Sequence, residues 1–236
     1  LLNHLGLKKQ LVSYHEHNKL ESGPHILTRL QNGESCALVT DAGTPAISDP
    51  GEDLVRLCRE QGVPVTAIPG PCAAITALAM SGLPTGRFTF EGFLSVGKRS
   101  RREHLQSLLE ETRTMIFHEA PHRLRATLSD MAEAFGGERR VALCRELTKL
   151  HEETMRMTLA EATDYYAANE PRGEYVLVVA GRETSDAPAM TLEEGVALVL
   201  RRREEGMRLK DAVRAVADDT GLSRNALYDA ALKNLA

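Results

Sequence analysis

Residues 38–51, with the sequence LVTDAGTPAISDPG, are the stretch that decides the fold of this chain. The apolar residues 37–39 predict a buried strand that ends at Asp41. Asp49 followed by Pro50 is typical of a helix start, because Asp is a good N-cap and Pro suits the first helical position. The stretch therefore predicts a strand, a loop of small residues and a helix. In open α/β sheets such loops bind ligands at the carboxyl ends of the strands.

A second loop of the same kind follows at 68–74, with the sequence IPGPCAA. It lies between a predicted strand at 63–68 and a predicted helix at 72–80. Because only one strand separates the two loops, we expect them to form one wall of a ligand pocket.

The whole chain has 236 residues, of which 42% are hydrophobic and 26% charged, so a packed globular core is expected. A net charge of -4 excludes a globally basic nucleic-acid binder but leaves room for a local basic patch. The four cysteines form no C-x-x-C pair, which argues against a disulfide framework and a thiolate metal site and suits a reducing cytoplasm. No apolar run approaches the roughly 18 residues of a membrane span, and no signal peptide is recognisable.

Strand-like and helix-like segments alternate up to about residue 80, which predicts a parallel sheet with covering helices, and a second α/β series follows residue 86. The other predicted strands are 12–14, 87–93, 114–118, 140–144, 155–158 and 175–180. The other predicted helices are 23–30, 51–61, 101–111, 121–135 and 159–168. A linker-like stretch at 81–86, which contains two Gly and one Pro, and a polar hinge at 184–188 divide the chain. We therefore expect an α/β domain at 1–84, a second at 85–183 and a helical tail at 190–236.

The tail carries only helical signals. Its turn at 220–222, followed by Ser223 as a helix cap, resembles a helix-turn-helix. A turn glycine and a cap serine also occur in many ordinary helix pairs, so a small helical cap that packs on the body is the favoured interpretation.

Two motifs resemble known chemistry without fulfilling its requirements. Residues 118–122, HEAPH, match the zinc-protease pattern, but that chemistry needs both His on one helix. Here a strand is predicted up to His118 and Pro121 fits only a helix start, so no metal site is expected. Residues 92–99, GFLSVGKR, nearly match a phosphate loop, but Arg99 stands where a hydroxyl is required. The polar segment 15–18, HEHN, fits a surface or cleft loop better than a metal site.

A basic run at 98–102, KRSRR, occupies a predicted loop-to-helix junction. Such a run can neutralise phosphates, although a solvated loop is the commoner role of clustered charge. Our candidate RNA contacts are Lys98, Arg99, Arg101 and Arg102, together with Arg123.

Seven segments occur in the order expected of one family: 38–51, 69–78, 81–85, 91–94, 119–124, 145–149 and 173–181. Together they resemble the bacterial small-subunit (16S) rRNA (cytidine-2'-O-)-methyltransferases, a family of the tetrapyrrole methylase superfamily. The resemblance extends to about Gly181 and more loosely into the tail. It implies two α/β domains with S-adenosyl-L-methionine in the cleft between them, a helical tail and a homodimer.

The resemblance also implies site residues. Cofactor contacts would come from Asp41, Gly43, Thr44, Pro45, Ile47, Ser48, Asp49, Pro71, Cys72, Ala73, Ala74, Glu119, Leu147, Glu174 and Tyr175. A 2'-hydroxyl is a weak acid and benefits from a base or a cationic neighbour. Candidate bases are Glu119 and Glu146, and candidate stabilisers are Lys149 and Arg123; geometry alone could also suffice.

This chain departs from the family pattern at several points. His118 stands where Tyr is more frequent, and Ser95 where Pro usually follows Gly-Phe-Leu. Cys72 and Ala73 replace two Ser, so cofactor contacts there would use backbone groups. The family also implies an upstream strand and two motifs before the first residue, which the Met-less start leads us to expect in a longer protein.

Two rival functions remain open. A tetrapyrrole (precorrin-type) methyltransferase would share the fold, and its polycarboxylate substrate would also attract Arg and Lys. A non-catalytic RNA-binding ribosome-assembly factor is the other rival. The aromatic content of 4%, with no Trp, leaves little for base stacking and argues against a simple single-strand binder.

Overall fold

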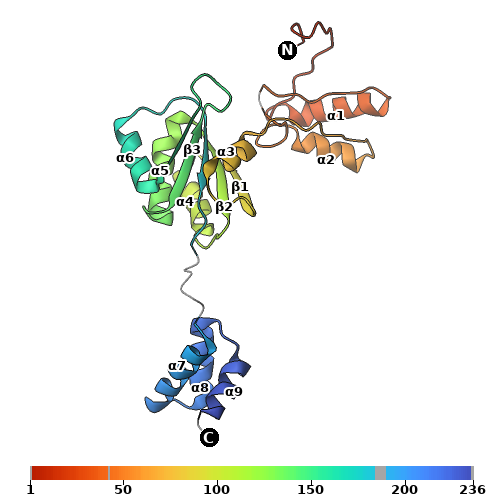
Figure 1. Cartoon of the computed structure of the whole chain (residues 1–236). Helices are drawn as coiled ribbons and strands as arrows, with labels where there is room; N and C mark the ends of the chain where they lie inside the picture. Colours follow the sequence, from red (N-terminus) through yellow and green to blue (C-terminus); the bar gives the residue numbers. More distant parts are fainter. Residues whose placement is uncertain (1, 42, 184–189, 235–236) are drawn as a thin grey trace. The chain divides into compact units, whose positions relative to one another are not determined.

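The structure is a computed structural model that describes the chain except residues 1, 42, 184–189 and 235–236. The chain forms two compact units, Leu1–Arg182 and Glu183–Ala236 (Figure 1). The polar hinge predicted at 184–188 lies outside the described residues.

A five-stranded sheet organises the first unit, with the strand order β1-β2-β5-β3-β4. The strands are β1 (Phe88–Phe93), β2 (Thr114–Glu119), β3 (Arg140–Arg145), β4 (Glu153–Thr158) and β5 (Tyr175–Val179). Only β1 and β2 pair in parallel, and β5 runs antiparallel to both β2 and β3. The antiparallel pair β3–β4 completes the sheet.

The parallel sheet predicted before residue 80 is wrong for the described residues, which form no strand there, and in the sheet that does form every pair except β1–β2 is antiparallel. Residues 146–152, which join β3 to β4, contain no helix. A parallel pair needs a crossover of a dozen or more residues, usually helical, whereas a short loop suits an antiparallel pair. The composition of a segment is enough to predict a strand. The direction in which the strand runs depends on the strand it pairs with and on the length of the connection.

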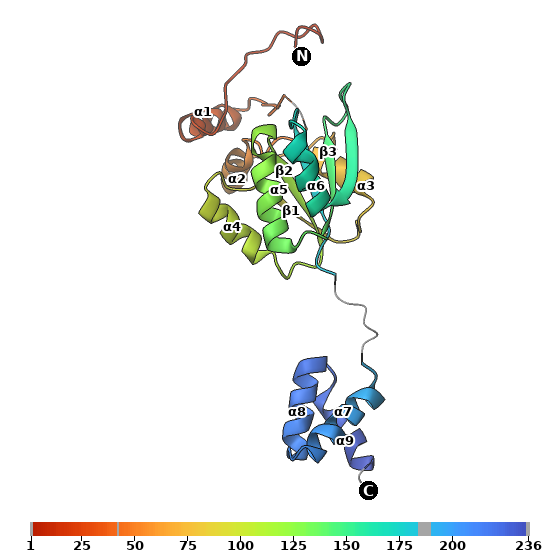
Figure 2. The ribbon, with the colours of Figure 1, turned by 90° about the vertical axis from the view of Figure 1, so that its left-hand side faces the viewer.

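Alternate residues of the strands face two separate cores. Met115 and Phe117 of β2 pack with one set of helices, whereas Ile116 between them packs on the opposite face. The helices of the first set are α4 (Lys98–Ser107), α5 (Pro121–Phe135) and α6 (Leu159–Ala168). Of these, α5 and α6 lie side by side (Figure 2). Helix α3 (Ala73–Ser81) covers the other face.

Two helices have the predicted bounds because their first turns carry clear signals. Pro121 occupies the first turn of α5, where its missing N–H costs nothing. Thr158 and Glu161 form a capping box at the start of α6. Helix α4, by contrast, begins at Lys98, three residues before the predicted start, so the basic run lies within a helix.

The segment before α3 contains helices α1 (Lys19–Gln31) and α2 (Glu52–Glu60), which share a small core. The strands predicted at 12–14, 37–41 and 63–68 are wrong for the described residues, because none of these segments forms a strand. Val39, Val65 and Ile68 are 62%, 49% and 90% exposed. A strand needs a neighbour to pair its backbone groups, and no strand lies beside these segments in the described structure.

The C-terminal end of α3 is held by a side chain from β4. Arg156 donates from Nε to the carbonyl oxygen of Ser81 at 3.1 Å and from Nη2 to that of Met80. Gly82, in the left-handed conformation, ends the helix. Arg156 thus satisfies carbonyl groups that would otherwise lack a partner at the helix end.

The second unit contains α7 (Leu192–Glu204), α8 (Leu209–Thr220) and α9 (Arg224–Lys233) around their own hydrophobic core. Gly221 adopts a positive φ of 72° at the turn, and the Ser223 side chain caps α9, which confirms both sequence signals.

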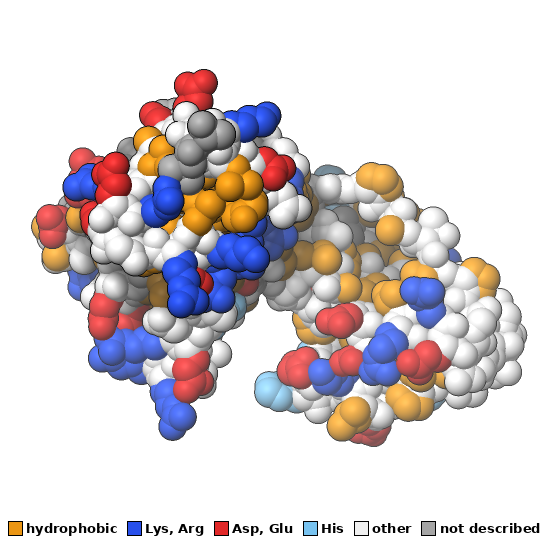
Figure 3. Space-filling model, turned by 90° about the horizontal axis from the view of Figure 1, so that it is seen from below, with side chains coloured by type: hydrophobic (Ala, Val, Ile, Leu, Met, Phe, Trp, Pro, Cys, Tyr) orange, Lys and Arg blue, Asp and Glu red, His pale blue; other side chains and the backbone are white. Residues whose placement is uncertain are grey.

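Surface charge is mixed. On the face in Figure 3, Lys and Arg side chains are interspersed with Asp and Glu side chains. Within the described residues, no helix is both long and apolar enough to span a membrane.

Candidate active site

The two predicted cofactor loops touch each other. The hydroxyl of Thr44 donates to the carbonyl oxygen of Pro71 at 3.0 Å, and the hydroxyl of Thr40 donates to the Asp49 carboxylate at 3.2 Å. The first bond links the loops and the second closes the first loop on itself. Predicted residues that are exposed are Asp41, Gly43, Ile47, Ser48, Pro71 and Ala73, whereas Thr44, Pro45, Asp49 and Cys72 are half-buried and Ala74 is buried.

Backbone strain is concentrated at two predicted site loops. Among the described residues, the non-glycine residues with positive φ are Ala46, Ser48, Glu146 and Thr148, at 66°, 56°, 51° and 65°. L-residues seldom adopt this conformation, and where they do, the surrounding structure must hold them. Sequence reasoning did not single out Ala46 or Thr148, because ordinary side chains carry no sign of positive φ.

The loop after β3 is fastened to the segment before β5 by charge. Lys149 Nζ lies 2.9 Å from Glu146 Oε1 and 3.0 Å from Glu174 Oε2. The backbone N–H of Glu174 also donates to Glu146 Oε1 at 3.1 Å. The hydrogen bond from Lys149 lowers the pKa of Glu146, and the bonds to Glu146 and Glu174 raise the pKa of Lys149. The Lys149 ammonium group therefore lies between the side chains of Glu146 and Glu174.

Glu119, a candidate base and cofactor contact, is enclosed by partners. Its side chain is fully buried and accepts hydrogen bonds from the Thr127 hydroxyl at 2.5 Å and from the Ala120 N–H at 2.9 Å. Arg123 Nε lies 3.4 Å from it and also donates to the carbonyl oxygen of Leu94. This geometry argues against Glu119 as a base and against Arg123 as an RNA contact. The polar atoms of both side chains are already engaged with neighbouring groups at the end of β2.

Tyr175 and Leu147 also point inward. Tyr175 is 2% exposed, and its hydroxyl accepts from the Arg172 N–H at 3.2 Å. Leu147 packs with half-buried Cys72 against the core beneath α3. The Tyr175 side chain is therefore enclosed by the protein rather than open to a ligand.

The basic run divides into buried and exposed members. Arg101 is 8% exposed and donates from Nε to the Asp130 carboxylate of α5 at 2.7 Å, so the structure does not present it to RNA. Arg102 pairs with Asp130 and Glu133 but stays partly exposed. Lys98 and Arg99 are exposed, and together with Arg102 and Glu103 they line a surface hollow.

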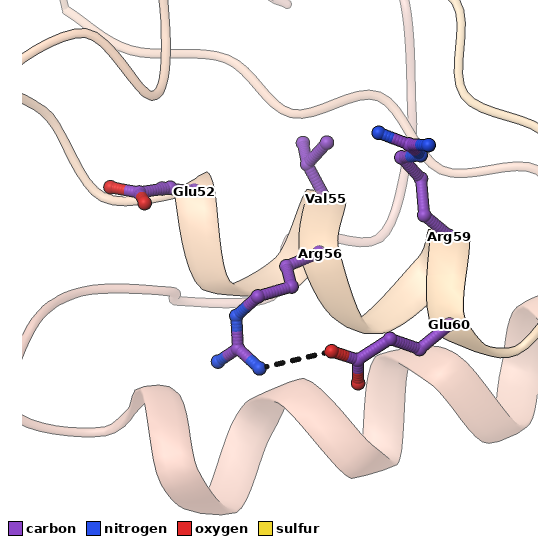
Figure 4. A pocket seen from close by; sticks show the side chains of 5 residues that line it. All are labelled: Glu52, Val55, Arg56, Arg59 and Glu60. Atoms are coloured by element: carbon purple, nitrogen blue, oxygen red, sulfur yellow. Dashed lines mark hydrogen bonds and ion pairs between the residues drawn. The ribbon is translucent and has the colours of Figure 1, made fainter.

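Two other places, the HEAPH motif and a hollow on α2, hold no group of metal ligands among the described residues. His118 lies on β2 and His122 on α5, as the sequence predicts. Among the described residues, no three His, Cys, Asp or Glu side chains are grouped to hold a metal ion. A hollow on α2 is lined by Glu52, Val55, Arg56, Arg59 and Glu60, where Arg56 pairs with Glu60 at 3.2 Å (Figure 4).

Two family models match the chain. The model described as Tetrapyrrole (Corrin/Porphyrin) Methylases matches residues 6–163, and the RsmI C-terminal HTH domain matches residues 191–235. The second match corrects the interpretation of the tail as an ordinary helical cap.

Solved structures with the same fold include the methyltransferase CobJ, at 18% identity and a TM-score of 0.53 over 76% of this chain and 77% of that one. Diphthine synthase gives 12% identity and a TM-score of 0.52 over 76% and 72%. At these identities the likeness concerns the fold alone, whereas the family model over residues 6–163 confirms the predicted tetrapyrrole methylase type.

Curated relatives that match nearly the whole chain carry the name Ribosomal RNA small subunit methyltransferase I, among them the following three. The protein from Synechocystis sp. is 46% identical over 99% of this chain and 84% of its own length. Those from Pseudomonas aeruginosa and Escherichia coli O157:H7 are 45% and 43% identical, over 99% of this chain and 83% and 81% of theirs. Because a family model matches residues 6–163 and these relatives match nearly the whole chain, the chain belongs to the tetrapyrrole methylase family, in the group of the small-subunit ribosomal RNA methyltransferase I proteins.

Proposed function

We propose that this protein methylates a cytidine 2'-hydroxyl of small-subunit ribosomal RNA, with S-adenosyl-L-methionine as the methyl donor. The observation that carries the substrate class is the name shared by relatives at 43–46% identity along nearly the whole chain. The choice of cytidine and of the 2'-oxygen rests on the seven sequence segments and their order. Family membership makes the chain an S-adenosylmethionine-dependent methyltransferase.

The cofactor residues we propose are those of the two touching loops and the strand ends near them. Cys72 precedes α3 with an extended backbone, and no side chain caps that helix. The first N–H groups of α3, at Ala73 and Ala74, lack intrahelical acceptors and suit a carboxylate such as that of the methionine moiety. This fits the absence of hydroxyl side chains at 72 and 73. When bound, S-adenosylmethionine supplies an electrophilic methyl group.

Lys149 and Glu146 are the catalytic residues we favour, with Glu119 as the third candidate. Because its pKa is raised, Lys149 is protonated at neutral pH and places a positive charge where an oxyanion could form. Glu146, with a lowered pKa, is a weak base but orients Lys149 through a 2.9 Å contact. Glu119 would have to leave Thr127 and Arg123 before it could take a proton.

RNA docking is assigned to the exposed side of α4. Lys98 and Arg99 are open to solvent at its first turn and stand beside Arg102 around one hollow. Cations so placed can neutralise phosphates. We further propose a cytoplasmic homodimer that acts on the RNA or on the assembled small subunit, with domain boundaries near 84 and 183.

A tritiated-methyl transfer assay tests the proposal. Naked small-subunit rRNA, assembled small subunits and a tetrapyrrole are offered in parallel to the full chain. We expect transfer to one or both RNA substrates and none to the tetrapyrrole, with the product mapped to a ribose 2'-oxygen. Transfer to the tetrapyrrole alone would establish the rival activity instead, and cofactor-independent RNA binding without any transfer would favour the assembly factor.

A further inference from the structure

Most of the phenylalanines of this chain lie on one edge strand. Three of its five phenylalanines, Phe88, Phe90 and Phe93, lie in β1 and are 38%, 38% and 52% exposed. The other two, Phe117 and Phe135, are 0% and 8% exposed. Large aromatic side chains are seldom left together at a surface unless they bind something.

A β-bulge turns two of these rings toward the same neighbour. The pairing register of β1 with β2 shifts between Phe90 and Gly92, which leaves Glu91 as an extra residue. In a regular strand, residues three apart face opposite sides, and a bulge re-aims one of them. Consequently the rings of Phe90 and Phe93 both meet His118 edge-on, at centroid distances of 5.2 and 5.4 Å.

The His118 ring offers an unused hydrogen-bonding atom between the two phenylalanines. Its Nε2 is buried and has no hydrogen-bond partner among the described residues. Burial lowers the pKa of His118, while the nearby charges of Asp49 and Glu174 act in the opposite direction. The ring is therefore neutral at pH 7, and its Nε2 can donate or accept according to the tautomer. Buried polar atoms without a hydrogen-bond partner are rare in proteins, so His118 Nε2 is a candidate contact for a bound ligand.

The strand that carries the aromatic cluster passes close to the proposed cofactor loop and leads on to α4 along the chain. A Cβ placed on Gly92 would lie 3.4 Å from Ser48 Oγ, so β1 passes close to the first loop. His118, like Ile116, faces the α3 side of the sheet, where α3 packs against β2, β3, β4 and β5. The exposed cations Lys98 and Arg99 begin α4, after a four-residue connection (94–97) from the end of β1.

We propose that Phe90, Phe93 and His118 form a stacking platform for a nucleobase of the RNA substrate. This inference rests on the proposed function and names the part of the site that holds the base. Every base has a face that stacks on an aromatic ring, and single-stranded RNA is recognised in this way. The edge of a base also carries donors and acceptors that could satisfy His118 Nε2.

The test compares three variants of the full chain. Phe93→Ala removes the more exposed ring, and Phe93→Tyr keeps a ring at that position. Phe88→Ala is the matched control, because Phe88 lies on the same strand, is as exposed as Phe90 and does not contact His118. For each protein we would measure S-adenosylmethionine affinity by calorimetry, the Kd and KM for small-subunit rRNA, and the oligomeric state by sedimentation.

We expect Phe93→Ala to weaken RNA binding about 10- to 100-fold, the range typical of one lost stacking contact. Cofactor affinity and oligomeric state should not change, and Phe93→Tyr and Phe88→Ala should behave as wild type. An RNA Kd and KM in Phe93→Ala equal to those of the wild type would overturn the platform. So would an equal loss in Phe88→Ala, or a changed oligomeric state in Phe93→Ala, which would make the surface an interface between copies. If the wild type itself methylates no RNA, the proposed function fails, a result distinct from any of these.

Discussion

Replacing Arg101 with Ala should damage the fold rather than RNA binding. The side chains of Arg101 and Asp130 are 9% and 7% exposed, and their ion pair joins α4 to α5 at 2.6 Å. Removing one partner of a buried pair generally costs about 3–5 kcal/mol, because the other charge is left buried. Arg102 still reaches Asp130 at 3.3 Å, so the lower end, about 3 kcal/mol, is expected. For a chain of this size, that corresponds to a Tm lowered by about 6–12 °C.

Urea denaturation followed by circular dichroism measures this loss, with Arg99→Ala as the control. The Arg99 side chain is 92% exposed, so its removal should change the unfolding free energy by less than about 0.5 kcal/mol. At a temperature where Arg101→Ala is folded, its RNA affinity should show the wild-type salt dependence. Lys98→Ala should lower the salt slope by roughly one unit. A stable Arg101→Ala protein with a flattened salt slope would refute the structural role.

Three further outcomes are expected. Gly43→Val should abolish S-adenosylmethionine binding without unfolding the protein, because Gly43 has a φ of +78° that a β-branched residue avoids; unchanged affinity by calorimetry would contradict this. Gly181→Ala should greatly reduce the yield of folded protein, since its Cβ would lie 2.0 Å from the carbonyl oxygen of Thr112, and a wild-type melting curve would argue otherwise. Hydrogen bonds from Arg113 lower the pKa of Glu111 from 4.5 to about 2. The stability that this carboxylate contributes is therefore present above pH 4.5 and lost as the pH falls toward 2, so Glu111→Gln should flatten the acid limb of the unfolding free energy.

Local signals predicted the second half of the first unit well. Pro121 and the Thr158–Glu161 pair fixed the starts of α5 and α6, because both act through neighbouring residues in the sequence. The strand Tyr175–Val179 was predicted from its unbroken apolar run, which is typical of a strand buried on both faces.

Features that depend on distant partners were not predictable in this way. The apolar run 37–39 has strand composition, but a strand forms only beside another strand. The burial of Arg101 depends on Asp130, 29 residues away, so a basic run alone could not distinguish a phosphate contact from a structural ion pair. Of the candidate site, the two loops were predicted from their small residues, and the structure brings them into contact through Thr44 and Pro71. The strain at Ala46 and Thr148 and the enclosure of Glu119 depend on tertiary contacts.

The two ends of helix α3 differ in how their backbone groups are hydrogen-bonded, and hydrogen exchange can measure this difference. Arg156 from β4 fastens its last carbonyl groups, whereas no side chain caps its first N–H groups. Amide hydrogens at Ala73 and Ala74 should therefore exchange with solvent quickly, and those near Leu78 slowly. A ligand carboxylate that accepted hydrogen bonds from the first turn would slow the fast group and leave the slow group unchanged. Deuterium uptake along this one helix would thus report cofactor occupancy directly, without a label on the cofactor and without turnover.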